Sequence, residues 1–197
     1  MEFFVLGRDA DGVDQLLEEL TEAHWSYMDR FAGQLRARGP LLSADRTRHA
    51  GSMHVVEVPD VAAAYRFAYE EPFECAGVFA DLSVTRYVSC GHRTMFDGSP
   101  AAQPAASALV VSRWDAEPMT AGLLEELSAA ATEAAGEAWV FLGLLLSDDG
   151  ASCLGAAGAL DLAEQEAAPA FEAMLAATGH ASTAVVAAAW QRGGRRA

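Results

Sequence analysis

Apolar residues near the start of the chain follow the two periodicities that separate strands from helices. Residues 2–8 (EFFVLGR) form a short apolar, β-prone run. Residues 14–35 then space their apolar side chains as one face of a helix. We therefore predict a strand followed by an amphipathic helix, whose apolar face carries Leu16, Leu17, Leu20, His24, Met28, Phe31 and Leu35.

The pattern continues with a second helix and three strands. Gly39 is a predicted stop after the first helix. The second helix opens at Pro59-Asp60, and Pro72 prevents its regular continuation. The strands are a short one from Pro40, GSMHVVEV (51–58) and SVTRYVSC (83–90). The order β-α-β-β-α-β is that of the ferredoxin-like motif, in which both helices cover one face of a four-stranded antiparallel sheet.

The same order of elements recurs in the second half of the chain. Residues 96–106 (FDGSPAAQPAA) concentrate Gly, Ser and Pro, as interdomain linkers do. We divide the chain into a first domain (1–97), a linker (98–106) and a second domain (107–197). Strands are predicted at 108–114, 138–146, 151–160 and 182–190, and helices at 119–135 and 161–177. The spacing of about 100 residues indicates two tandem ferredoxin-like modules of the α+β class.

A single ferredoxin-like sheet leaves one face uncovered, and burying that face normally requires another sheet or a partner subunit. Two modules in one chain provide the second sheet. We therefore expect the halves to pack face to face as a pseudo-dimeric α/β barrel. In the alternative arrangement, each half pairs with a second chain, so a homodimer stays open.

Charge and hydropathy narrow the classes of partner. The 28 acidic and 13 basic side chains give a formal net charge of −15, which repels phosphate backbones and anionic lipid surfaces. The longest apolar stretch, 138–146, is about half of what a membrane span requires. No basic, apolar and small-residue leader pattern follows Met1. We expect a cytoplasmic protein that binds a small molecule, and neither nucleic acid nor membrane.

Three segments of the first half resemble the YCII-related family. Residues 53–87 (MHVVEVPDVAAAYRFAYEEPFECAGVFADLSVTRY) resemble the family's strand, helix, acidic-Pro-aromatic, Ala-Gly-aliphatic-Phe and final strand. RGPLL (38–42) resembles its turn into the second strand, and AHWSYMDRF (23–31) resembles the helix segment that holds its histidine. None of these segments recurs in the second half, which we interpret as a degenerate copy.

The resemblance implies a catalytic pair made by His24 and Glu71. The family acid is usually aspartate, and the neighbouring Glu70 leaves the choice of partner open. Such a pair makes chemical sense, because an imidazole titrates near pH ~6.5 and a carboxylate on one ring nitrogen orients it for proton transfer. Related proteins include a dehydrochlorinase of a chlorinated hydroxyquinol and, in the wider fold group, muconolactone isomerase. Their chemistry needs no cofactor, so none is expected here.

Further residues are candidates for binding a substrate. Tyr27, Phe73 and Phe79 are aromatic residues near the expected pair, and each suits either a pocket wall or the core. Arg46, Arg48 and His49 lie in the predicted loop between the second and third strands and suit either an anionic substrate group or a solvated loop.

Other types of site find little support in the sequence. His49, His54 and His92 are assigned to different elements and show no HxH or HExxH spacing, so no metal site is predicted. No GxGxxG, Walker or GxSxG motif is present, which disfavours nucleotide binding and serine-hydrolase chemistry.

Two classes of function follow. The first is a cofactor-free lyase, isomerase or cyclase that acts on a small aromatic or enolisable molecule through His24 and Glu71. The second is a non-catalytic module that binds a small ligand or a protein in the same cleft. The second half has no histidine on its first helix and only AATG (176–179) after its second, so a purely structural accessory protein also remains open.

Overall fold

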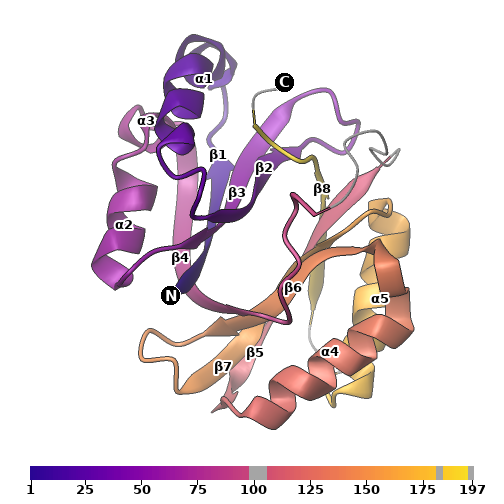
Figure 1. Cartoon of the computed structure of the whole chain (residues 1–197). Helices are drawn as coiled ribbons and strands as arrows, with labels where there is room; N and C mark the ends of the chain where they lie inside the picture. The colour runs from indigo at the N-terminus through magenta and orange to yellow at the C-terminus, as the bar shows by residue number, and fades with distance from the viewer. Residues whose placement is uncertain (98–105, 181–183, 195–197) are drawn as a thin grey trace.

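The computed structural model describes residues 1–97, 106–180 and 184–194. Eight antiparallel strands form a closed barrel, and the helices lie outside it in two groups on opposite sides (Figure 1). The first module comprises β1 (Glu2–Asp9), α1 (Asp14–Asp29), β2 (Leu35–Leu42), β3 (His49–Glu57), α2 (Val61–Tyr69), α3 (Pro72–Cys75) and β4 (Phe79–Ser89). The second comprises β5 (Ser107–Pro118), α4 (Ala121–Ala135), the 3-10 helix η1 (Gly136–Ala138), β6 (Trp139–Leu146), β7 (Ser152–Leu160), α5 (Glu164–Ala177) and β8 (Val185–Trp190).

The strand order confirms the tandem ferredoxin-like prediction. The sheets run β4-β1-β3-β2 and β8-β5-β7-β6, so corresponding strands occupy corresponding places. The barrel closes where β4 pairs with β6 and where Leu41 of β2 pairs with Trp190 of β8. The two halves therefore pack within one chain as the expected pseudo-dimeric barrel. Of the predicted linker, residues 98–105 lie outside the described part of the chain.

The barrel has one apolar layer inside and one outside each sheet. Phe4, Tyr87, Phe141 and Trp190 belong to the interior layer, and the Tyr87 hydroxyl reaches over β6 and donates to the carbonyl oxygen of Ala157 in β7 at 2.9 Å. The helices of each module cover the outer face of its own sheet. This explains why β6 is apolar at nearly every position, since one face meets the barrel interior and the other meets α4 and α5.

The predicted end of the first helix is wrong. Helix α1 ends at Asp29, and Leu35 begins β2, where it packs into the layer beneath the helices. Gly39 is a residue of strand β2 and does not end the helix. Glycine is needed at this position because the C-terminal segment lies against it, and a Cβ there would overlap the backbone oxygen of Gln191. Gln191 N–H donates to the carbonyl oxygen of Pro40 at 3.2 Å, which ties the second module to β2.

Within the described residues, no helix is both long and apolar enough to cross a membrane.

Candidate active site

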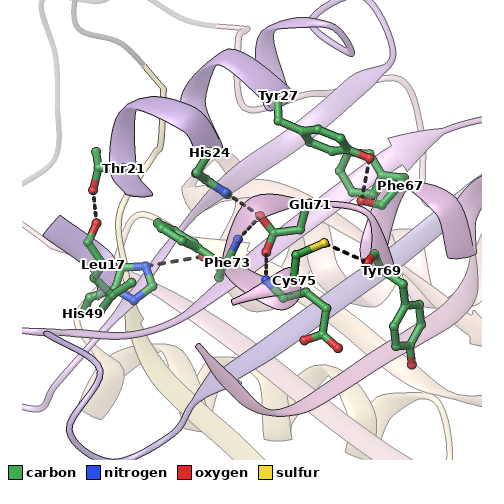
Figure 2. Close-up of polar contacts among 12 residues, drawn as sticks. Leu17, Thr21, His24, Tyr27, His49, Phe67, Tyr69, Glu71, Phe73 and Cys75 are labelled. Atoms are coloured by element: carbon green, nitrogen blue, oxygen red, sulfur yellow. Dashed lines mark hydrogen bonds and ion pairs between the residues drawn. The ribbon is translucent and has the colours of Figure 1, made fainter. Parts of the chain in front are cut away.

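The structure brings the two predicted residues into direct contact. His24 lies on the face of α1 that points toward the sheet, and its Nδ1 is 2.8 Å from Oε2 of Glu71 (Figure 2). Both residues are buried, with 9% and 3% of their surface exposed. Glu70 is exposed at the end of α2, so Glu71 is the partner. Burial leaves little water to compete for this hydrogen bond, which favours a fixed geometry.

The short helix α3 fixes the carboxylate. Glu71 is its N-cap residue and Pro72 occupies its first turn, the arrangement that a capping acid followed by proline favours. The backbone N–H of Phe73 donates to Oε2 at 3.1 Å, and that of Glu74 donates to Oε1 at 3.0 Å. Both oxygens of Glu71 therefore accept backbone hydrogen bonds in addition to the contact with His24.

The same helix also holds the imidazole. The Phe73 ring stacks on the ring of His24, with centroids 4.2 Å apart and planes only 7° apart. Stacking on one side and the Glu71 hydrogen bond at Nδ1 leave the imidazole little freedom to turn. Nε2 of His24 has no hydrogen-bond partner within the described residues, so it is the nitrogen available to another molecule.

A cavity of about 240 Å³ lies beside this pair. It is bounded by α1, by β2 and β3, and by Gly193 and Gly194 from the end of the second module. The N–H of Gly193 donates to the carbonyl oxygen of Arg38 at 2.9 Å, which holds the C-terminal segment against the cavity. Its volume lies just below the usual range for drug-sized ligands and suits a molecule of about one ring.

A second histidine–carboxylate pair borders the same cavity. Nδ1 of His49 is 2.7 Å from Oδ2 of Asp9, and its Nε2 is 3.4 Å from the hydroxyl of Ser52. The ring meets Phe73 edge-on at 6.0 Å between centroids. The expectation that His49 and His54 belong to different elements is wrong, because β3 begins at His49 and carries both.

His54 contributes an uncharged polar group to the cavity wall. Burial lowers its pKa well below the usual histidine value, and the nearby His24 and Arg38 lower it further. Its ring centroid is 6.0 Å from that of His24. His54 is therefore neutral at neutral pH and can donate or accept a single hydrogen bond from each nitrogen, depending on tautomer.

Arg38 is the cationic residue of the cavity wall. Its Nε is buried without a hydrogen-bond partner in the described residues, and its Nη1 is 3.7 Å from the carboxylate of Asp29. The positive charge of Arg38 on the cavity wall suits an anionic or polar oxygen of a bound molecule. Sequence reasoning missed this residue, although it begins the family-like segment RGPLL.

Of the predicted substrate-binding residues, Phe73 and His49 line this cavity. The Tyr27 hydroxyl donates to the carbonyl oxygens of Arg66 and Phe67 in the core, and Phe79 packs against Gly7. Arg46 binds the carboxylate of Glu164 at 2.7 Å, which joins the two modules, and Arg48 is exposed. The described residues contain no group of three His, Cys, Asp or Glu side chains arranged to hold a metal ion.

The fold and site define a class: a two-module α+β barrel with a buried histidine–carboxylate pair outside the sheet of one module. Residues 1–88, just under half of the chain, match the sequence model of the YCII-related domain family. Comparison with curated proteins gave no match.

Solved structures resemble either the first module or the whole barrel. The 5-chloro-2-hydroxyhydroquinone dehydrochlorinase of Burkholderia phenoliruptrix is 28% identical over 44% of this chain and 92% of its own, with a TM-score of 0.42. A proposed monooxygenase from Lactobacillus acidophilus is 10% identical over 97% of this chain and 93% of its own, with a TM-score of 0.53. A heme-binding protein from Thermus thermophilus is 9% identical over 96% of this chain and 90% of its own, with a TM-score of 0.55. The last two show that the complete two-module barrel is a fold found elsewhere.

Proposed function

We infer that the protein is an enzyme that moves a proton on a compact, hydroxylated aromatic or enolisable molecule. The observation that carries this proposal is the 2.8 Å contact between His24 and Glu71 at the edge of a cavity of about 240 Å³. Nε2 of His24 takes the substrate proton as general base. Glu71 does not touch the substrate and acts as a positioning residue, because it holds Nδ1 and thereby fixes which nitrogen is free.

The cavity also offers groups for the other parts of such a reaction. Loss of a proton from a hydroxyl or an activated C–H leaves negative charge on a substrate oxygen, and the guanidinium of Arg38 stabilises it. His49, held by Asp9, is placed to return a proton or to protonate a leaving group. An isomerisation returns the proton at another atom, whereas an elimination from a chlorinated hydroxyquinol releases a proton and chloride without an external oxidant.

The test measures proton transfer directly and does not need the natural substrate. The protein is incubated in deuterated water with a panel of chlorinated hydroxyquinols, unsaturated lactones and β-dicarbonyl compounds, and NMR follows C–H exchange, isomerisation and chloride loss. We expect one class to react, and the His24→Asn variant to lose about 10²–10⁴-fold of the rate.

The matched control is Glu70→Gln, which removes the neighbouring exposed carboxylate and should leave the rate unchanged. Glu71→Gln should lower the rate with a smaller effect on affinity, since Glu71 acts through His24. Full activity in the His24→Asn variant would contradict the proposal. Binding of panel compounds without any exchange or turnover would instead favour the non-catalytic binding module.

A further inference from the structure

The interior of the barrel is filled by side chains at one end and holds a cavity at the other. Inward-facing residues of β1 run from Phe4 through Leu6 to Arg8, and those of β5 run from Leu109 through Val111 to Arg113. Near Phe4 the interior is filled, but toward the arginines it opens into a cavity of about 660 Å³, here called the barrel cavity. It is lined by Leu6, Arg8, Leu41, Leu42, Ala50, Asp81, Ser83, Leu109, Val111, Arg113, Ala184, Val186 and Ala188.

The barrel cavity forms because side chains are small at one end. β8 turns the bulky Trp190 into the filled end, but contributes only Ala188, Val186 and Ala184 further along. An eight-stranded barrel has an interior that side chains just fill, or that holds one small ligand when they do not. The volume lies within the usual range for ligand sites, and most of the lining is aliphatic.

The charged residues of the barrel cavity favour an anion. The charged residues that line the cavity are two arginines, Arg8 and Arg113, and one carboxylate, Asp81. Asp81 lies opposite Arg8 in the β1–β4 pair. Arg113 donates to the hydroxyl of Thr85 at 3.0 Å, and neither arginine has an ion pair among the described residues. The cavity therefore carries an excess of one positive charge inside a chain whose net charge is −15.

This cavity is distinct from the one beside His24. The two lie on opposite faces of the first module's sheet, since one is inside the barrel and the other is under α1. They share no lining residue in the described parts of the chain. The larger cavity suits a longer and more apolar molecule than the single-ring substrate proposed for the smaller one.

We propose that the barrel cavity is a second binding site, which takes an apolar organic carboxylate. The aliphatic body of the ligand lies along Leu6, Leu109 and Val111, and its carboxylate accepts hydrogen bonds from Arg8 and Arg113. This site goes beyond the proposed proton-transfer function and does not depend on it.

The experiment compares three probes of equal chain length by calorimetric titration: decanoate, 1-decanol and decyltrimethylammonium. Decanoate should bind about tenfold or more tightly than the alcohol, and the cation should bind most weakly. Arg8→Gln and Arg113→Gln should each weaken decanoate by about tenfold and leave the alcohol unchanged. Arg66→Gln is the matched control, because it removes the same charge from an exposed position on α2.

Two further variants locate the site. Val111→Trp narrows the barrel cavity and should weaken binding of both decanoate and decanol, whereas His24→Asn should not affect either. Circular dichroism checks folding, and the two arginine variants test the site even where Val111→Trp fails to fold. Equal binding of decanoate and decanol, no binding of decanoate, or loss of binding in His24→Asn would each overturn the proposal.

Discussion

The hydrogen bond between His24 and Glu71 can be tested for stability without any substrate. The perturbation is a double-mutant cycle made of His24→Leu, Glu71→Gln and the two together. Leucine keeps the helical, largely buried position filled, and glutamine keeps a carbonyl oxygen for one of the two backbone donors of α3, while its NH2 group faces the other. The cycle therefore isolates the interaction between imidazole and carboxylate.

The structure sets the expected magnitude. A hydrogen bond to a charged group contributes about 1.5–3 kcal/mol, and this one is 2.8 Å long with both partners buried. Because glutamine can accept only one of the two backbone hydrogen bonds, Glu71→Gln alone should destabilise the fold by about 1–3 kcal/mol. We expect the coupling energy between the two sites to be about 1–2 kcal/mol.

Urea denaturation followed by circular dichroism gives the free energy of unfolding of each variant. A parallel cycle with Glu70→Gln provides the control, since Glu70 is exposed and forms no hydrogen bond with His24 within the described residues. That second cycle should be additive to within about 0.5 kcal/mol. Additivity in the Glu71 cycle as well, or coupling to Glu70 in its place, would refute the assignment of Glu71 as the fixed partner of His24.

Three other predictions concern stability. The pKa of His54 is lowered in the folded state, so the unfolded chain takes up the proton first. Stability should therefore fall as pH drops below about 6.5, by up to about 1.4 kcal/mol per pH unit, and urea titrations at several pH values should show a shallower fall in His54→Asn. Phe73→Ala removes a buried ring and should cost about 3–5 kcal/mol in the same assay, with Phe73→Leu costing less; equal costs would contradict the packing. Gly39→Ala should push the Gln191 backbone away and make the C-terminal segment sensitive to limited proteolysis, while Gly33→Ala, where a Cβ meets nothing, should not.

The order of strands and helices was predictable because each element carries its own periodicity. Strand β6 and helix α2 need no knowledge of their neighbours to be recognised, and α2 begins directly after Pro59-Asp60 as predicted, with Asp60 as its N-cap. The boundary between α1 and β2 was not predictable in this way. Phe31 and Leu35 fit the spacing of a longer helix, and only the packing of Leu35 beneath the helices shows that it starts a strand.

The candidate site was predictable only in part. The resemblance supplied His24 and Glu71, because both lie in segments with the family's order of residues. Arg38 and His49 enter the same cavity through the pairing of β2 and β3, and the pairing of Asp9 with His49 joins residues 40 positions apart. Composition and local spacing carry no information about such contacts, so the second histidine pair required the folded chain.

The second module explains why the chain has one such site and not two. The space between its helices and its sheet is filled by Trp139, Phe171 and Met174, and the Trp139 ring N–H donates to the carbonyl oxygen of Ala131 at 2.9 Å. This module instead contributes Gly193 and Gly194 to the cavity beside His24. The two modules are therefore unequal parts of the proposed site: the first provides the His24–Glu71 pair, and the second provides part of the wall.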